Sequence, residues 1–253
     1  MLRGVLLDLG GVLYVGDAAV PGAVRAMQRL RASGLPLGFV TNTTRSARSG
    51  VAARLERLGF DCHASEIHTP SMTARAVIRE RGLHPLLLVH PDLRWEFPRR
   101  GAAPADAVIV GDAGETFTYD RLNRAFRVLM QGAPLLALAR NRYFREPDGL
   151  SLDAGAFVAG LEYAAGVSAE LLGKPAPGFF RAAVAALGVP AEEVVMIGDD
   201  AENDVGGALS AGLQGMLVCT GKYRPGDEAA VAGRADVVAD LPEAVERIVG
   251  ARQ

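Results

Sequence analysis

The sequence has few features of a secreted or metal-thiolate protein. Only two of its 253 residues are cysteines, Cys62 and Cys219, and their spacing suggests neither a disulfide framework nor a thiolate metal site. We therefore expect both to be small core residues. The four histidines show no metal-ligand spacing, so no histidine-based metal site or mechanism is predicted.

Long apolar runs and an excess of one charge are also absent. No stretch approaches eighteen uninterrupted apolar residues, and Asp8 interrupts the N-terminal apolar stretch, where a secretory signal would have no charge. The 27 basic and 29 acidic residues are mixed along the chain, without the basic stripe that nucleic-acid binding requires. We therefore expect a cytoplasmic protein that binds neither nucleic acid nor a membrane.

Strand and helix patterns alternate at both ends of the chain. Buried strands are predicted at residues 5–7, 37–40, 194–197 and 216–218, with amphipathic helices at 21–32 and 51–58. This alternation is typical of an α/β protein with a doubly wound parallel sheet, as in Rossmann-like folds.

The middle of the chain has an α/β pattern of its own. Strands are predicted at residues 86–89, 108–110 and 135–138, and helices near 121–130 and 156–165. The strand ends with polar residues lie on both sides of this block and not within it. We therefore predict a core domain made of residues 1–71 and 171–253, with an inserted domain at 72–170.

Polar residues follow three of the predicted core strands. These residues are Asp8, Thr41 and Asp199. Because ligands bind at the carboxyl ends of strands in open α/β sheets, we expect the three to converge on one site. Lys174 begins the helix that precedes the Asp199 strand and would bring an ammonium group to the same place. Carboxylates with one lysine suit a divalent metal and a phosphate group.

Each of these motifs taken alone also fits a structural role. An aspartate after a strand is often a turn residue or a helix cap, and Thr41-Asn42 is a common pair at a helix entry. Gly173-Lys174-Pro175 also fits a surface turn. Asp199, Asp200 and Asp204 repel one another unless a cation or solvent compensates, and Asp200 also suits a solvated or helix-capping position.

Taken together and in order, the motifs resemble those of the haloacid dehalogenase (HAD) superfamily. They are Asp8-Leu9-Gly10-Gly11-Val12-Leu13-Tyr14, Thr41-Asn42, Gly173-Lys174-Pro175, and Gly198-Asp199-Asp200 followed by Asp204. The insertion resembles the α/β cap, of type IIA or C2, in the NagD-like branch. Residues 111–117, 148–150 and 220–225 further resemble the group of phospholysine phosphohistidine inorganic pyrophosphate phosphatase (LHPP) and HAD-like hydrolase domain-containing protein 2.

This resemblance implies a magnesium-dependent phosphatase. Asp8 would be the nucleophile and would form an aspartyl-phosphate, which divides one displacement into two easier ones. The Asp8 carboxylate, the Gly10 carbonyl and Asp199 would hold Mg2+. Asp204 would bind the ion through water or orient Asp199 and Lys174.

The same resemblance assigns the phosphate group to Thr41, Asn42 and Lys174, whose donors would neutralise the oxygens of the transferring phosphoryl group. The family pattern D-x-D has a general acid/base aspartate where this chain has Gly10. Such catalysis is worth about 100-fold to 10,000-fold in rate. We therefore expect small phosphorylated substrates with good leaving groups, namely pyrophosphate, phosphoramidates and acyl phosphates. The LHPP-like group also departs from D-x-D here, with serine, and its substrates belong to this class.

Two other functions stay open at this stage. Gly10 favours a regulatory protein that binds phosphate and metal with little turnover, whereas intact Asp8, Lys174 and Asp199 favour the hydrolase. The other alternative to the hydrolase is a phosphotransferase, in which an acceptor hydroxyl replaces water. The resemblance also implies a homodimer, because the cap in this branch often mediates dimers.

Two places in the inserted domain are candidates for contacting the substrate. Arg142 and Tyr143 lie in a predicted loop that would face the active site, and a solvated hairpin is the alternative. Asp153, in the turn at the start of the next helix, is the other candidate. Trp95 is expected to pack within this domain or at a subunit contact.

Overall fold

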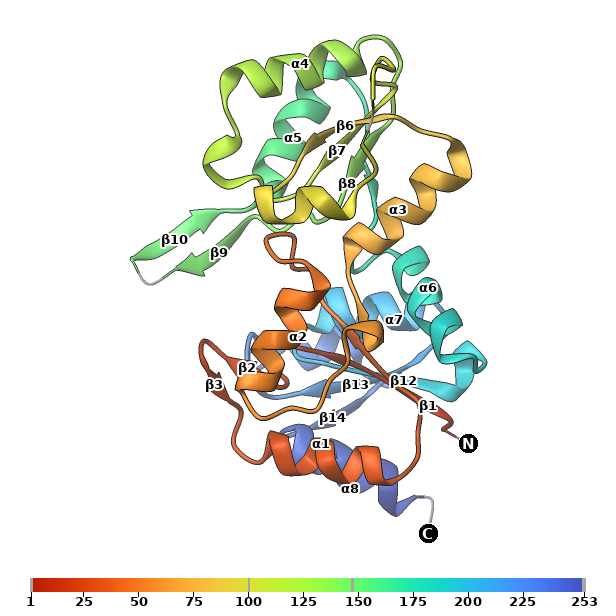
Figure 1. Ribbon diagram of the computed structural model, residues 1–253. Helices are drawn as coiled ribbons and strands as arrows, with labels where there is room; N and C mark the ends of the chain where they lie inside the picture. The colour runs from red at the N-terminus through yellow and green to blue at the C-terminus, as the bar shows by residue number, and fades with distance from the viewer. Residues whose placement is uncertain (1, 100, 147, 252–253) are drawn as a thin grey trace. The chain divides into compact units, whose positions relative to one another are not determined.

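The computed structural model describes residues 2–99, 101–146 and 148–251 (Figure 1). The chain divides into two compact units. The first comprises Met1–Thr41, Arg48–His68 and Lys174–Gln253, and the second comprises Asn42–Ala47 and Thr69–Gly173. The predicted inserted domain, 72–170, falls inside the second unit. The short segment Asn42–Ala47, which we had assigned to the core, groups with the second unit instead.

Contacts of Asp112 explain why this short segment groups with the second unit. The hydroxyl of Thr44 accepts a hydrogen bond from the backbone N–H of Asp112 at 2.9 Å. Arg45 forms an ion pair with the buried Asp112 carboxylate and lies over the ring of Phe144, 4.3 Å from its centroid. These long-range contacts have no signature in the local sequence.

The first unit contains a six-stranded parallel sheet with the order β14-β13-β12-β1-β4-β5. Its strands are β1 (Gly4–Asp8), β4 (Leu37–Val40), β5 (Ile67–His68), β12 (Val194–Gly198), β13 (Gln214–Val218) and β14 (Asp236–Val238). The four core strands predicted from the sequence are present, and the doubly wound α/β fold is confirmed. The short edge strands β5 and β14 were not predicted.

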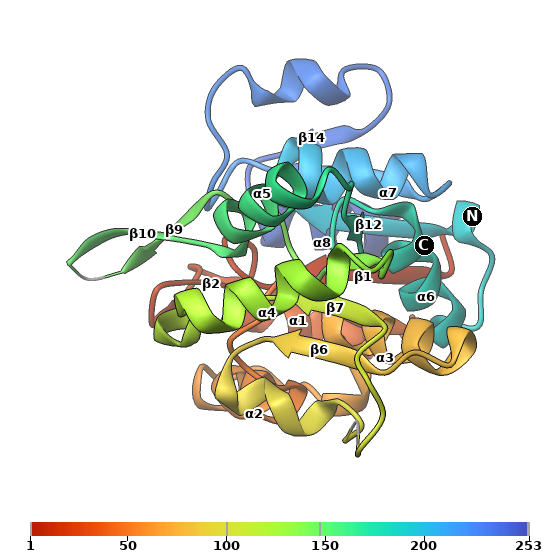
Figure 2. The same cartoon turned by 90° about the horizontal axis from the view of Figure 1, so that it is seen from above.

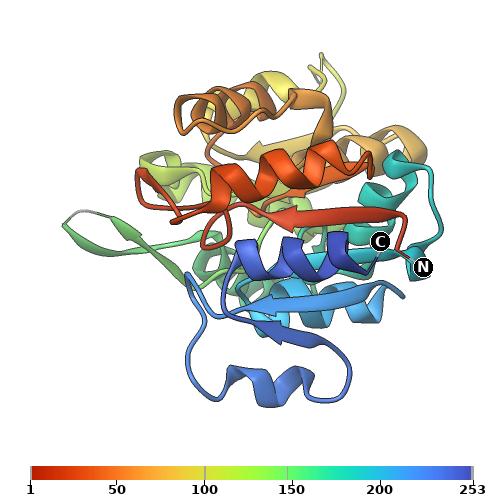
Figure 3. The same ribbon diagram turned by 90° about the horizontal axis from the view of Figure 1, so that it is seen from below.

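Helices cover both faces of this sheet (Figures 1 and 3). They are α1 (Ala23–Ala32), α2 (Arg48–Arg57), α6 (Pro177–Leu187), α7 (Gly207–Ser210) and α8 (Leu241–Gly250). Because side chains alternate along a strand, Val5 and Leu7 of β1 pack in the core under α1, α2 and α8. Leu6 faces the other way, into the core formed with α6 and α7. Burial on both faces makes β1 apolar throughout up to Asp8.

The second unit has a smaller parallel sheet with the order β11-β8-β7-β6. Its strands are β6 (Pro85–Leu88), β7 (Ala107–Val110), β8 (Leu135–Ala137) and β11 (Glu170–Leu171), and its helices are α3 (Pro70–Arg81), α4 (Tyr119–Leu129) and α5 (Ala154–Ala165). Helices α4 and α5 pack together on one face of this sheet, and α3 packs on the other (Figures 1 and 2). The three strands predicted here are present within a residue or two of their expected bounds.

Two hairpins complete the described structure. In the first unit, β2 (Tyr14–Val15) pairs with β3 (Ala18–Ala19). In the second, β9 (Tyr143–Glu146) pairs with β10 (Gly149–Leu152). Tyr143, Leu150 and Leu152 are all exposed on the second hairpin. The segment that we had predicted as a loop therefore forms the exposed hairpin that was our alternative.

Some expectations about single residues are wrong. Cys219 is exposed and Cys62 is only partly buried, so the two cysteines are not both core residues. Trp95 is 68% exposed, so it does not pack in the interior of the second unit, and the other expectation for it, a subunit contact, stays a prediction. Among the described residues, no helix has both the length and the apolar character needed to cross a membrane.

Candidate active site

The carboxyl ends of three neighbouring strands meet at one edge of the first unit's sheet. Asp8 pairs in register with Val40 of β4, and Leu7 pairs with Ile197 of β12. Thr41 and Asp199 therefore follow their strands at the same edge as Asp8. The chain leaves β1 toward β4 on one side and later returns to β12 on the other. This change of direction is the place where open α/β sheets bind ligands.

Three buried carboxylates and one buried ammonium group gather at this edge. One carboxylate oxygen each from Asp8, Asp199 and Asp204 lie within 4.8 Å of one another. Nζ of Lys174 lies 2.5 Å from Oδ1 of Asp8 and 2.5 Å from Oδ1 of Asp204. All four residues are at most 7% exposed. The structure thus brings together four of the residues singled out in the sequence.

Two glycines leave room for the Asp199 carboxylate. A Cβ atom would lie 1.9 Å from Oδ2 of Asp199 if added at Gly11, and 2.1 Å from it if added at Gly221. Both glycines have positive φ angles, which other residues rarely adopt. The backbone N–H of Lys222 donates to Oδ2 of Asp199 at 2.7 Å, and the Thr220 hydroxyl donates to the Gly11 carbonyl at 2.6 Å. The segment after β13 therefore positions Asp199.

The sequence alone indicates no role for Gly11, Thr220, Gly221 or Lys222. Their signal was a glycine in the turn after each of two core strands, Gly11 after β1 and Gly221 after β13. Such glycines are common in turns. Only the close approach of the Asp199 carboxylate shows that these two positions need a residue without a side chain.

Asp204 reaches the cluster from the π-helical turn Ala201–Gly206. A Cβ atom at Gly198 would lie 2.2 Å from the Cβ of Asp204, so glycine is needed there for the close approach. The neighbouring Asp200 accepts hydrogen bonds from the backbone N–H groups of Glu202 and Asn203. Asp200 is thus a cap of this turn, in agreement with the structural role considered for it.

Burial and neighbouring negative charges raise the pKa values of two of the carboxylates, Asp199 and Asp204. Burial, with the neighbouring charges of Asp8 and Asp204, raises the pKa of Asp199 to about 7. Burial also raises the pKa of Asp204 to about 6, although Lys174 acts against this. For Lys174, the charges of Asp204 and Asp8 outweigh burial and raise the pKa. One lysine beside three carboxylates leaves excess negative charge, and hard oxygen donors of this kind fit Mg2+.

Gly10 and Thr41 border this cluster along the chain. A Cβ atom built on Gly10 meets no atom within 4 Å, and Gly10 does not have a positive φ angle. The position therefore has space for a side chain. Thr41 is buried, and its backbone N–H donates to the carbonyl of His68 at 3.2 Å.

The other candidate residues belong to the second unit. Asn42 is the first residue of the segment that groups with it. Arg142 and Tyr143 lie at the start of the exposed hairpin. Asp153 is buried and caps α5, accepting a hydrogen bond from the N–H of Ala154 at 2.6 Å, and burial raises its pKa. A role in substrate binding remains a prediction for these four residues.

Known proteins resemble this chain along nearly its whole length. Residues 5–101 match the family described as haloacid dehalogenase-like hydrolase, and residues 171–244 match the one described as HAD-hydrolase-like. Phospholysine phosphohistidine inorganic pyrophosphate phosphatase of Rattus norvegicus is 45% identical over 255 residues, covering 98% of this chain and 94% of the relative. Haloacid dehalogenase-like hydrolase domain-containing protein 2 of Bos taurus is 46% identical over 227 residues, covering 90% and 88%.

Solved structures agree with these sequence relatives. The 4-nitrophenylphosphatase of Thermotoga maritima superposes with a TM-score of 0.88 at 26% identity, over 97% of both chains. NagD of E. coli K-12 superposes with a TM-score of 0.87 at 26% identity, over 96% of this chain and 98% of that one. The chain therefore belongs to the haloacid dehalogenase-like hydrolases, in their NagD-like branch, and is a phosphatase of that type.

Proposed function

We propose that this chain is a magnesium-dependent phosphohydrolase in which Asp8 attacks the phosphorus atom of a small phosphorylated substrate. The preferred substrates would have good leaving groups, such as pyrophosphate, phosphoramidates and acyl phosphates. The observation that carries this proposal is the buried cluster in which Lys174 contacts both Asp8 and Asp204 beside Asp199. The name of the 45% identical relative, which includes phospholysine, phosphohistidine and pyrophosphate, supports the substrate class.

The contacts of Asp8 indicate how it would act. Lys174 donates to its Oδ1 atom, so we assign the attack to the other carboxylate oxygen. In the first step that oxygen forms a bond to phosphorus while the bond from phosphorus to the leaving group breaks. In the second step the oxygen of a water molecule forms a bond to phosphorus while the bond from phosphorus to Asp8 breaks. The Asp8 carboxylate is regenerated, inorganic phosphate is released, and the protons of the water leave with the phosphate or pass to solvent.

Lys174 and Thr41 would bind the transferring phosphoryl group. The Lys174 ammonium group is fixed between two carboxylates, so it needs no reorganisation to offset charge that develops on the phosphoryl oxygens. The Thr41 hydroxyl follows the strand next to Asp8, and we assign the N–H of the following residue, Asn42, to the same group. In this proposal Asp204 also positions Lys174.

Asp8, Asp199 and the backbone carbonyl of Gly10 would hold Mg2+, and Asp204 would hold it through water or orient its ligands. When bound, the ion supplies positive charge that offsets the negative charge of the phosphoryl group. The fit rests on the three buried carboxylates, which share one lysine, and burial raises the pKa values of two of them, Asp199 and Asp204.

Gly10 provides no side chain to protonate a leaving group. General acid/base catalysis contributes about 100-fold to 10,000-fold in rate, or roughly 3–5 kcal/mol of barrier. Substrates whose leaving groups need little protonation would lose least. This argument favours phosphoanhydrides, phosphoramidates and acyl phosphates over alkyl phosphate esters.

The test is phosphate release in the presence of Mg2+ from pyrophosphate, phospholysine, phosphohistidine, acetyl phosphate and para-nitrophenyl phosphate. Asp8→Asn, which removes the nucleophilic charge with little change in volume, is the matched control. We expect release from the labile substrates that is lost in Asp8→Asn. Equal release by both proteins would exclude Asp8 as the nucleophile.

Gly10 also supports a second candidate, a protein that binds phosphate and metal but turns over very slowly. Among the described residues, chain neighbours aside, none has an atom within 4 Å of a Cβ atom built at Gly10, and glycine itself supplies no acid/base group at this position. This candidate predicts Mg2+-dependent binding of phosphate with no release above the Asp8→Asn background on any of the five substrates.

A further inference from the structure

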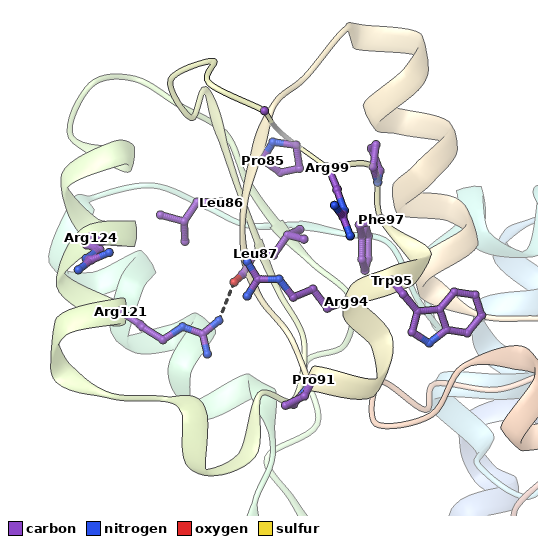
Figure 4. Close-up of a pocket in the computed structure, with 12 residues that line it drawn as sticks. Pro85, Leu86, Leu87, Pro91, Arg94, Trp95, Phe97, Arg99, Arg121 and Arg124 are labelled. Atoms are coloured by element: carbon purple, nitrogen blue, oxygen red, sulfur yellow. Dashed lines mark hydrogen bonds between the residues drawn. The ribbon is translucent and has the colours of Figure 1, made fainter.

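The second unit contains a large cavity whose charged side chains are all arginines. Its volume is about 1010 Å³, at the upper end of the range for small-molecule sites. The arginines that line it are Arg94, Arg99, Arg121 and Arg124. They come from the 3-10 helix Pro91–Glu96, the segment after it and α4 (Figure 4). None of the lining residues belongs to the first unit, so the cavity is separate from the Asp8 cluster.

Arg121 is held in place by backbone groups and not by an acidic partner. Its guanidinium group donates to the carbonyl of Thr116 at 3.1 Å and to the carbonyl of Leu87 at 3.0 Å. It forms no ion pair with any carboxylate in the described ranges. Burial and the nearby charge of Arg94 lower its pKa. The structure therefore fixes a guanidinium group in the cavity without neutralising its charge.

The other arginines add positive charge with little compensation. The guanidinium groups of Arg94 and Arg99 make no hydrogen bond or ion pair with any of the residues described. Arg124 pairs with Asp120 at 3.0 Å, but both of these side chains are about two-thirds exposed. Figure 4 shows Arg94 and Arg121 reaching from two different elements toward the space beside Leu87. Gathering like charges is unfavourable unless an anion is bound among them.

The size and charge of the cavity identify the class of anion. Guanidinium groups match phosphate oxygens in planar, two-point contacts, and four of them around one cavity exceed what a single phosphate can use. Pro85, Leu86 and Leu87 supply an apolar wall, and Trp95 borders the cavity with most of its indole exposed. A ligand that suits both parts has adjacent phosphates joined to a less polar group.

We propose that this cavity is a binding site for a small molecule with two or more linked phosphate groups, such as a nucleoside diphosphate or triphosphate. Arg94 and Arg121 bind the phosphates, and Arg99 and Arg124 contribute further positive charge. The apolar wall contacts the remainder of the ligand. The site binds its ligand without involving Asp8, and the proposal does not depend on the function proposed for that residue.

Calorimetry and fluorescence test this site directly. ATP, tripolyphosphate and adenosine are titrated into the full chain in EDTA, without added divalent cation, so that a magnesium-dependent centre stays unloaded. Trp95 is the only tryptophan of the chain, so its emission reports on this cavity. We expect ATP and tripolyphosphate to bind and to change the Trp95 emission, adenosine to bind at least tenfold more weakly, and added salt to weaken binding of the two polyphosphates.

Variants inside and outside the cavity test whether ATP binds there. Arg94→Gln with Arg99→Gln removes two exposed charges that support no internal contact, so the fold should stay intact, and ATP binding should weaken about tenfold or more. Arg127→Gln, on α4 but outside the cavity, and Asp8→Asn should leave ATP binding within about twofold. Thermal denaturation of each variant checks the fold.

Three results would overturn the proposal. The first is no binding of ATP or tripolyphosphate at about 1 mM ligand. The second is binding that survives Arg94→Gln with Arg99→Gln, or that is lost in Asp8→Asn. The third is arginine-dependent binding of a polyglutamate peptide but not of either polyphosphate, which would assign the cavity to a protein partner.

Discussion

The Nζ atom of Lys174 lies 2.5 Å from Oδ1 of Asp8, although the two residues are 166 positions apart in the sequence. The same ammonium group lies 2.5 Å from Oδ1 of Asp204. Because all three side chains are buried, each charge depends on the others for compensation. This dependence makes Lys174 important for stability and, in our proposal, for catalysis.

Replacing this lysine should therefore affect both properties. Lys174→Met keeps a similar volume but leaves Asp8 and Asp204 facing each other without a cation. We expect a loss of up to about 3–5 kcal/mol in the free energy of unfolding, the range for breaking a buried pair. Phosphate release should fall about 100-fold or more, since a charge aimed at the phosphoryl group is lost. Urea denaturation and steady-state kinetics measure the two effects.

Lys222→Met is the control for this variant. The Lys222 side chain is 71% exposed, and its contact with Asp199 uses the backbone N–H, which the substitution keeps. It should change stability by less than about 0.5 kcal/mol. If Lys174→Met were as stable and as active as Lys222→Met, the buried contacts of Lys174 would have neither role.

The sequence could predict those parts of the fold that depend on local patterns. The buried strands before Asp8 and Asp199 are continuous apolar runs, and both were predicted within a residue or two of their bounds. β5 and β14 have two and three residues, too few to show a periodicity. The segment Asn42–Ala47 joins the second unit through contacts with Asp112, about 70 positions away, which no local pattern reveals.

The candidate site likewise contains some residues that local sequence patterns reveal and others that they do not. Asp8, Lys174, Asp199 and Asp204 could be found because each stands in a short motif next to a predicted element. Gly11 could not be assigned, because its role depends on the approach of Asp199 from another strand. The cavity lined by arginines was also missed. Its arginines lie on the 3-10 helix Pro91–Glu96, the segment after it and α4, and look like ordinary solvent-exposed charges in the sequence.

The two glycines after Asp8 should respond very differently to substitution. A Cβ atom at Gly11 would collide with Asp199, and the φ angle of 85° at Gly11 adds backbone strain of about 1 kcal/mol or more. A Cβ atom at Gly10 meets nothing within 4 Å. We expect Mg2+ to raise the melting temperature of the natural chain, Gly11→Ala to abolish this increase and the activity, and Gly10→Ala to retain the increase. A Gly11→Ala protein with unchanged Mg2+ response would show that Asp199 is not positioned as described.

His68 should make stability depend on pH. Burial lowers its pKa to about 4, below the ordinary value of 6.5. Because His68 binds a proton more tightly in the unfolded chain than in the folded one, protonation favours unfolding. The free energy of unfolding is therefore not reduced by His68 above about pH 6.5 and decreases as the pH falls toward 4. The loss should reach about 3 kcal/mol at most, because each pH unit between the two values is worth about 1.4 kcal/mol.

A non-titrating side chain tests this assignment. His68→Gln should show a shallower loss of stability than the natural chain between pH 7 and about pH 4.5, measured by denaturation at each pH. His84→Gln is the control, because His84 is half exposed and close to Asp106. Parallel pH profiles for the natural chain and His68→Gln would rule out His68 as the source of the acid sensitivity.

Gly10→Asp should increase turnover of substrates with poor leaving groups. A Cβ atom at Gly10 meets nothing within 4 Å and the φ angle there is not positive, so the backbone can carry a side chain at this position. A carboxyl group there would supply the general acid that is missing from the proposed mechanism, an effect worth about 100-fold to 10,000-fold when fully developed. We expect kcat for an alkyl phosphate ester to rise at least tenfold, and kcat for acetyl phosphate to rise much less, because its leaving group needs little protonation. Gly10→Asn, with the same shape but no transferable proton, should give no such rise. An equal gain for both substrates, or for both variants, would mean that leaving-group protonation does not limit the reaction.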